Sequence, residues 1–127
     1  MNINKFTIKS QEALQQAQQI AQSFGQQQLE NEHIFKGILE VDENVTPFIL
    51  KKLNVNVELF KKVLDSTIQS FPKVSGGDIM FSREAGTTVN EAEIIAKKMN
   101  DEFVSIEHLI LAIFKSKSKV AQILKDQ

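Results

Sequence analysis

The chain has 127 residues, of which 42% are hydrophobic and 24% are charged, with a formal net charge of -1 and no cysteine. This length predicts one domain with a real core, the charge balance argues against nucleic acid as a partner, and the missing cysteines exclude disulfides and thiol chemistry. No run approaches the roughly 18 apolar residues of a membrane span, and the start lacks the apolar stretch of a secretory signal, so we expect a cytoplasmic protein with no membrane partner.

The first half of the chain predicts four helices. An apolar stripe at helical spacing marks the first helix, with Thr7 as its expected N-cap and Gly25 at its end. The second helix is expected over about residues 31–40. Thr46-Pro47 is predicted to open the third, with the threonine as cap and the proline at the first helical position. Asn56 is the expected cap of the fourth.

The second half begins after a glycine-rich segment. Phe71-Pro72 is predicted to stop the fourth helix, and the segment 73–78 that follows is the clearest boundary in the chain. Beyond it, Ser82 and Ser105 are the expected caps of two further helices, and a last helix is expected over about residues 120–125. No run alternates between apolar and polar residues with period two, so essentially no strand is expected.

The two halves of the chain repeat each other. A shift of 75 residues places Phe6 on Phe81 and the dipeptide Glu32-His33 on Glu107-His108, with matching apolar positions between them. After a one-residue gap, the tripeptide Ile-Leu-Lys also recurs. One register held over more than thirty residues indicates the duplication of one helical unit.

The duplication predicts both the fold class and the domain organisation. We expect an all-α protein in which two tandem, pseudo-symmetric helical repeats form one compact domain over residues 1–127. The first repeat is predicted over 6–71 with about four helices, the linker over 72–80, and the second repeat over 81–127 with three. A counterpart of the fourth helix would begin near residue 131, so we expect the sequence to be a fragment of a longer protein.

No motif for catalysis is found in the sequence. Because the phosphate-binding pattern G-x-x-x-x-G-K-[ST] is missing, we predict no catalytic residue and no ATP hydrolysis by this domain. The repeat-equivalent His33 and His108 would suit a metal site if the two units faced each other. Their places in the first turn of a second helix favour duplication alone, so no metal is predicted. The glutamines between residues 15 and 28 are expected on a solvated helix face.

The paired units resemble a known family. The residues that carry the resemblance are Phe6-Thr7, Ala13-Leu14, Ala17, Ile20-Ala21, Glu32-His33-Ile34 and Gly37-Ile38-Leu39 in the first unit, and Phe81-Ser82, Ala92, Ala96 and Glu107-His108-Leu109 in the second. They are similar to the Clp N-terminal repeat of AAA+ Clp ATPases. The connector from Phe71 to Gly77 is similar to the Leu-Pro-x-Val-x-Gly region of ClpB-type disaggregases.

The resemblance implies a stress-response chaperone in which this domain recognises substrate. Such a domain is mobile on a homohexameric ring and binds unfolded or aggregated polypeptide near the seam between its repeats. ATP and Mg belong to the ring, so no cofactor is expected here, and the isolated domain is expected to be a monomer. The substrate-binding residues that the resemblance implies are Thr7, Val89, Asp101 and Glu107. Glu91 and His108 stand where relatives place apolar groove residues, which implies a less apolar groove.

Three other interpretations remain open. A ClpC- or ClpA-type unfoldase domain would bind adaptor proteins or phosphoarginine, and the resemblance assigns the phosphoarginine contacts to Glu32 and Glu107. A metal-dependent enzyme would use His33 and His108 and would take up zinc. A helical spacer would show no affinity for unfolded chains.

Overall fold

The computed structural model describes residues 2–74 and 76–126, so Met1, Gln127 and Ser75 of the predicted linker lie outside the described residues. Within these ranges the elements, in chain order, are η1 (Ile3–Lys5), α1 (Ile8–Ser23), β1 (Gln28–Leu29), α2 (Asn31–Val41), α3 (Val45–Lys52), α4 (Val57–Gln69), β2 (Met80–Phe81), α5 (Arg83–Lys98), α6 (Ile106–Lys115) and α7 (Lys119–Asp126). The predicted all-α class with two pseudo-symmetric repeats is confirmed. The repeat boundaries 6–71 and 81–127 stay a prediction.

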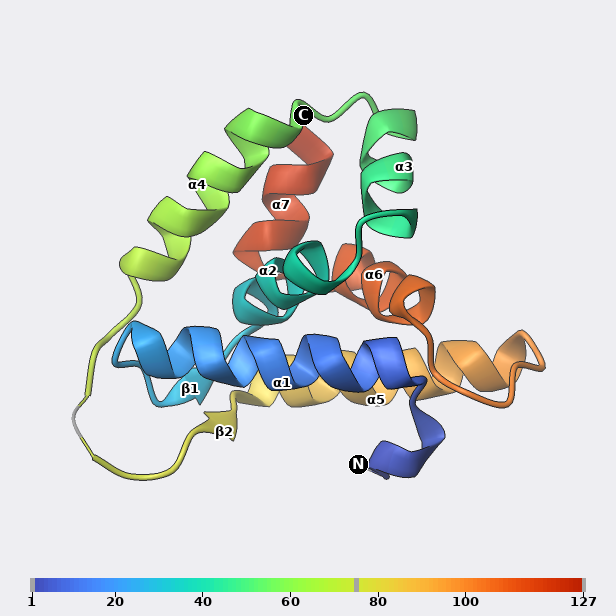
Figure 1. The fold of residues 1–127 in the computed structure, drawn as a ribbon, viewed down its shortest axis with the longest axis horizontal. Coiled ribbons are helices and arrows are strands. Elements are labelled where there is room, and N and C mark those ends of the chain that lie inside the picture. Colours follow the sequence, from blue (N-terminus) through green and yellow to red (C-terminus); the bar gives the residue numbers. More distant parts are fainter. Residues whose placement is uncertain (1, 75, 127) are drawn as a thin grey trace.

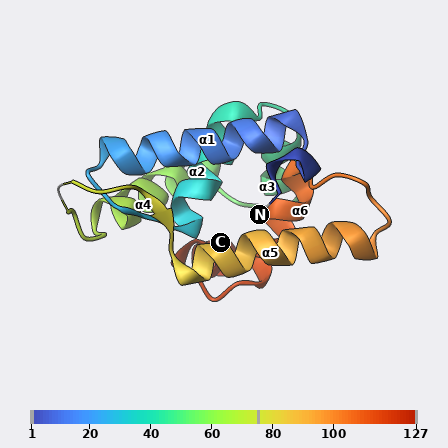
Figure 2. The ribbon, with the colours of Figure 1, turned by 90° about the horizontal axis from the view of Figure 1, so that it is seen from below.

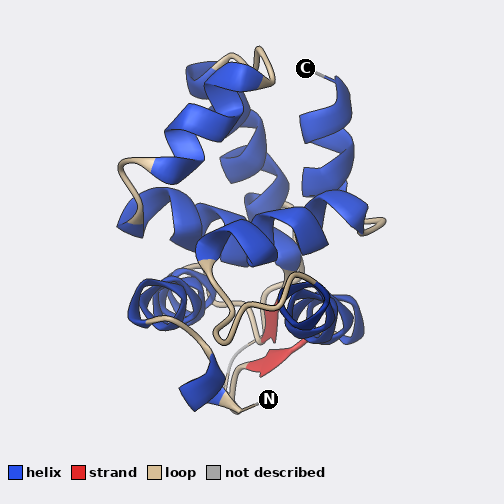
Figure 3. Cartoon of the chain, turned by 90° about the vertical axis from the view of Figure 1, so that its right-hand side faces the viewer, coloured by secondary structure: helices blue, strands red, loops and turns tan. Residues whose placement is uncertain are grey.

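The helices are arranged in three levels, which Figures 1 and 3 show from two sides. Helices α1 and α5, each of 16 residues, run along one end of the molecule, and Figure 2 shows them from below on opposite sides of this end. Helices α2 and α6 form the middle level, and α3, α4 and α7 stand over them. The largest side chains of the core are Phe6, Phe35, Phe60, Ile34, Ile38, Leu50, Leu64, Ile68, Leu109 and Ile113.

Most helix ends have the capping residues that the local sequence predicts. The side chains of Thr7 and Ser82, which are repeat-equivalent, accept hydrogen bonds from the N–H groups three residues further on, at 3.1 and 3.0 Å. Asn56 caps α4 in the same way at 3.1 Å. Gly25 follows the end of α1 with φ of +70°, a conformation that glycine adopts without strain. The predicted caps of these helices are confirmed.

The predicted cap of the third helix is wrong. Helix α3 begins at Val45, so Thr46 lies inside its first turn and is buried. The N-cap residue is Asn44, and the donors at the helix start are satisfied by the Asp42 carboxylate, which accepts hydrogen bonds from the N–H groups of Asn44, Val45 and Thr46 at 3.1, 3.2 and 2.7 Å. Two carboxylate oxygens satisfy three unpaired donors at the helix start, which one threonine hydroxyl cannot do.

A small parallel sheet corrects the expectation of essentially no strand. Strands β1 and β2 pair Gln28 with Met80 and Leu29 with Phe81. Each strand has two residues, which is too short to produce an alternating apolar pattern in the sequence. The sheet joins the first repeat to the last residue of the predicted linker and the first residue of the second repeat, and therefore holds the start of the second repeat against the first.

An equivalent parallel pairing occurs a second time, with the roles of the two repeats exchanged. Phe6 forms an isolated parallel bridge with Val104, and the Thr7 N–H donates to the Val104 carbonyl oxygen at 2.9 Å. A shift of 75 residues turns this bridge into the pair of Phe81 with Leu29. Each repeat thus pairs its first residues with the segment that precedes the second helix of the other repeat. These two reciprocal pairings define the seam between the repeats.

Candidate functional site

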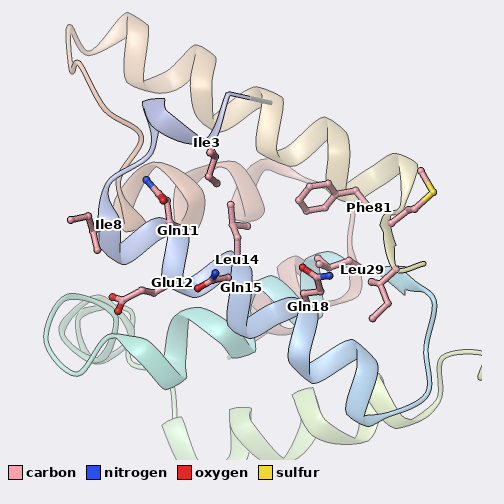
Figure 4. Close-up of a pocket in the computed structure, with 11 residues that line it drawn as sticks. Ile3, Ile8, Gln11, Glu12, Leu14, Gln15, Gln18, Leu29 and Phe81 are labelled. Atoms are coloured by element: carbon pink, nitrogen blue, oxygen red, sulfur yellow. The ribbon is translucent and has the colours of Figure 1, made fainter. Parts of the chain in front are cut away.

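An open groove of about 660 Å³ lies along α1 at the seam. We call it the seam groove, and its lining residues are Ile3, Ile8, Gln11, Glu12, Leu14, Gln15, Gln18, Leu29, Ile79, Met80 and Phe81. Figure 4 shows α1 along one side, with Ile3 and Phe81 across from it. The side chains of Ile8 and Met80 are 77% and 71% exposed. Exposed apolar side chains gathered around one concave surface indicate a binding site for apolar groups.

The walls of the seam groove come from both repeats. Helix α1 and β1 belong to the first, and β2 spans the last residue of the linker and the first residue of the second. The Met80 N–H donates to the Gln27 carbonyl oxygen at 3.0 Å, which fixes β2 in place. The Gln11 side-chain amide donates to the Phe6 carbonyl oxygen at 2.9 Å and ties the end of η1 to α1. The groove therefore depends on the docking of one repeat against the other.

A second, polar cavity of about 400 Å³ adjoins the seam groove. The two share Gln18 and Ile79 in their linings. Beyond these, the residues that line the polar cavity are Gln22, Gly25, Gln26, Gln27, Val74, Gly76, Gly77 and Asp78. The seam groove and this cavity are thus neighbours along α1, and we call the two together the trough.

The substrate-binding residues expected from the sequence lie outside the seam groove. Thr7 caps α1, and Asp101 and Glu107 flank the segment of Val104 to which the Thr7 N–H is bonded. Asp101 and Glu107 are exposed. Val89 is only 3% exposed and packs in the core from α5. The structure thus brings three of the four residues around the Phe6–Val104 bridge and places the fourth in the interior.

Both histidines have structural hydrogen bonds. The Nδ1 atoms of His33 and His108 accept the N–H groups of Glu30 and Ser105, each at 2.8 Å, at the starts of α2 and α6. Their Nε2 atoms bond to a side-chain oxygen seven residues earlier, of Gln26 in the first repeat and of Asp101 in the second.

Burial has a further effect on the first histidine, since it lowers the pKa of His33 to about 4. Among the described residues, no group of three or more His, Cys, Asp or Glu side chains is arranged to hold a metal ion. The two histidines each serve their own helix start, and their match follows from the duplication.

Glu32 and Glu107 are equivalent in sequence but differ in the structure. Glu32 is 3% exposed, and its carboxylate accepts the Val120 N–H at 2.7 Å at the start of α7. Burial raises the pKa of Glu32, although the bond from Val120 opposes this effect. Glu107 lies exposed in the first turn of α6. Only the second of the two carboxylates is available to a ligand without breaking a hydrogen bond to Val120.

The glutamine-rich face differs in part from the expectation of a solvated surface. Gln15 and Gln18 are exposed but line the seam groove, and Gln26 is buried and donates to the Ile68 carbonyl oxygen at 2.6 Å. The apolar groove residues Ile8 and Met80 are not among the binding residues expected from the sequence. A usable signal was present, because both are apolar residues that lie outside the buried helical stripes.

Glu91 and His108 also lie away from the seam groove. Glu91 accepts a hydrogen bond from the Lys115 ammonium group at 3.1 Å, and His108 is 3% exposed at the start of α6. Neither side chain lines the groove along α1. The apolar character of this groove is therefore set by other residues.

The fold defines a small all-α domain with an open groove at the seam between its repeats, in a sequence without an ATPase motif. The chain belongs to the Clp repeat (R) N-terminal domain family, whose profile matches residues 5–127. This family assignment covers both repeats and the connector between them.

Curated relatives of this chain are ClpB chaperones. The chain is 51% identical to the chaperone protein ClpB of Bacteroides thetaiotaomicron and 40% identical to that of Porphyromonas gingivalis, in each case over 99% of this chain and 15% of the relative. It therefore spans about 15% of the length of these relatives. Among solved structures, the Hsp104 N-terminal domain from Candida albicans has a TM-score of 0.86 at 18% identity, over 96% of this chain and 81% of that one. This likeness shows the shared fold.

Of the helices in residues 2–74 and 76–126, none is both long and apolar enough to span a membrane.

Proposed function

We propose that this chain is the substrate-recognition domain of an ATP-dependent disaggregase of the ClpB type, and that it binds unfolded or aggregated polypeptide in the seam groove. The observation that carries the proposal is the exposed apolar lining of that groove, with Ile8 and Met80 largely open to solvent. The ClpB relatives over the whole chain support it. In the same proposal, a homohexameric cytoplasmic parent supplies the ATP- and Mg-dependent work.

The shape of the groove suits a partner that is common to many unfolded proteins. Unfolded chains expose apolar side chains that folded proteins bury, and an open groove accepts them without a matched pocket. The lining also includes glutamines, whose amides donate and accept hydrogen bonds and can satisfy the polar backbone that accompanies those side chains. Selection between unfolded and folded protein then follows from exposure of apolar groups.

Substitution of the groove tests this proposal. We expect fluorescently labelled, reduced and alkylated lysozyme to bind the domain, and native lysozyme to bind far more weakly. The double variant Ile8→Asn/Met80→Ser should weaken that binding about tenfold, since two exposed apolar contacts are lost. Phe48→Ser is the matched control, because Phe48 is 61% exposed but lies outside the groove. Equal losses in both variants would contradict the assignment to the seam groove.

The polar residues expected from the sequence form a separate candidate surface. We keep Thr7, Asp101 and Glu107 as proposed polypeptide contacts beside the Phe6–Val104 bridge, with Val89 supporting them from the core. Asp101→Ala or Glu107→Ala would weaken the binding of unfolded lysozyme if this surface takes part. Unchanged affinity in both variants would leave the seam groove as the binding surface.

A second candidate function is binding of an adaptor or of phosphoarginine, as in the ClpC- and ClpA-type domains. The exposure of Glu107 in the first turn of α6 favours it, because a carboxylate can pair with guanidinium while helix N–H groups bind phosphate. Glu32 would have to release Val120 to act in the same way. Titration with free phosphoarginine tests this function, and Glu107→Ala should abolish any binding that is seen.

A further inference from the structure

One side of the seam groove is a regular row of glutamines. Gln11, Gln15, Gln18 and Gln22 follow one another at intervals of four, three and four residues, so they share one face of α1. We call these four residues the glutamine row. The first three line the seam groove, as Figure 4 shows, and Gln18 and Gln22 line the adjoining polar cavity. The row therefore runs along the whole trough.

The length of the glutamine row matches a short extended segment. From Gln11 to Gln22 the helix advances by eleven steps of about 1.5 Å, or about 16 Å, which equals about five residues of extended chain at about 3.3 Å each. Each glutamine amide carries both donors and an acceptor, as does each peptide group. A row of such amides can satisfy the backbone of a bound segment whatever its side chains are.

The start of the second repeat offers backbone groups on the other side. Met80 directs its N–H to β1, where it donates to the Gln27 carbonyl oxygen at 3.0 Å. Because parallel strands alternate the direction of their backbone groups, the neighbouring Ile79 and Phe81 turn theirs away from β1. Both residues line the seam groove. The outer edge of a strand is a site where an extended segment can add as a further strand.

The charges of the trough are of one sign. Among the described residues that line the seam groove and the polar cavity, the only charged ones are Glu12 and Asp78. No lysine or arginine takes part in either lining. A segment with lysine or arginine between its apolar residues complements these two carboxylates, whereas an acidic segment would be repelled by them.

We infer that the trough binds an extended, basic and apolar polypeptide segment of about five residues through its backbone, between the glutamine row and the outer edge of β2. This inference rests on the proposed function and specifies which part of an unfolded chain is bound. Apolar side chains of the segment lie against the exposed Ile8 and Met80, and basic ones lie toward Glu12 and Asp78. Recognition of the backbone makes the site tolerant of sequence, while charge sets its preference.

Three peptides test the mode of binding in fluorescence anisotropy. The first is an eight-residue peptide that alternates valine with lysine, the second has N-methyl groups on its valine amides, and the third has glutamate in place of lysine. We expect the first to bind, the N-methylated peptide to bind at least about tenfold more weakly because it lacks backbone donors, and the glutamate peptide to bind at least about tenfold more weakly because of repulsion. Equal binding of the first two would overturn recognition through the backbone.

A pair of double variants tests the glutamine row. Gln15→Ala/Gln18→Ala should weaken binding of the valine–lysine peptide about tenfold, since two amide groups are lost. Gln16→Ala/Gln19→Ala on the same helix is the control and should stay within about twofold, because neither residue lines the trough. Alanine favours helix, so α1 is expected to fold in both variants.

The outcomes separate this inference from the proposed function. If unfolded lysozyme binds but both double variants bind the peptide equally, the glutamine row has no role and the inference is wrong while the proposed function stands. If neither unfolded lysozyme nor the valine–lysine peptide binds at all, the proposed function fails and the inference fails with it.

Discussion

The Glu32 carboxylate accepts a hydrogen bond from the Val120 N–H at 2.7 Å, so a side chain of the first repeat caps a helix of the second. Glu32 is almost fully buried at this contact. Its repeat-equivalent Glu107 lies exposed, and the helix that it would cap starts instead on Asp42. One position of the duplicated unit is thus structural in the first repeat and free for binding in the second.

Removal of this carboxylate should destabilise the domain. Glu32→Ala leaves the Val120 N–H without its buried acceptor, and we expect the free energy of unfolding to fall by about 1–3 kcal/mol. Urea denaturation followed by circular dichroism measures this change. Glu107→Ala serves as the matched control and should change stability by less than about 0.5 kcal/mol. Similar losses of unfolding free energy in both variants would show that the hydrogen bond from Val120 to Glu32 does not stabilise the domain.

Two glycines in helices should respond to alanine in opposite directions. A Cβ atom at Gly37 would collide with the Ala13 carbonyl oxygen, where α2 approaches the backbone of α1. Gly37→Ala should therefore cost about 1–3 kcal/mol, as overpacking does. A Cβ atom at Gly86 meets nothing within 4 Å, so Gly86→Ala should stabilise α5 by about 0.5–1 kcal/mol. Thermal unfolding of the two variants checks both signs, and a stable Gly37→Ala protein would contradict the close approach of α1 and α2.

The buried His33 should make stability depend on pH. Its pKa is lowered from 6.5 to about 4, so between these values the folded protein binds fewer protons at this site than the unfolded chain. The contribution of the neutral His33 side chain to the free energy of unfolding is complete above about pH 6.5. It is lost as the pH falls toward 4, for a total of about 3 kcal/mol. Unfolding free energies at several pH values should show this loss in the unsubstituted domain and a smaller loss in His33→Asn. Parallel pH profiles of the two proteins would contradict the assignment of this pH dependence to His33.

Metal ions should have no effect on the domain. Both ring nitrogens of His33 and of His108 are hydrogen-bonded, so a metal would have to displace these contacts. We expect zinc chloride and a chelator each to leave the unfolding temperature unchanged. Uptake of zinc in a fixed ratio, with a rise in unfolding temperature, would instead favour the metal-site interpretation.

The helical part of the fold is predictable because its causes are local. Apolar residues at helical spacing mark each buried face, and side chains such as Thr7, Asn56 and Ser82 cap helices through hydrogen bonds to N–H groups three residues away. Because the chain is duplicated, the positions of the helices in one repeat predict those in the other. These relationships need only neighbouring residues, so a single sequence contains them.

The features that were missed depend on residues far apart in the sequence. Strands β1 and β2 have only two residues each, so no local sequence pattern predicts that Leu29 pairs with Phe81. Ile8 of α1 and Met80 of β2 line one groove only when the repeats dock, so the groove itself could not be derived from either segment alone. Asp42 was overlooked because Thr46-Pro47 is itself a common helix start and competes as a signal.

Binding of unfolded polypeptide in the seam groove is best tested by an amide NMR titration of this domain with reduced and alkylated lysozyme, repeated with native lysozyme. We expect chemical-shift changes only with the unfolded protein, concentrated at Ile8, Gln15, Gln18, Met80 and Phe81. Changes confined to Asp101, Glu107 and their neighbours would place the binding surface at the Phe6–Val104 bridge. No change anywhere with the unfolded protein would contradict polypeptide recognition and would favour an adaptor-binding or spacer domain.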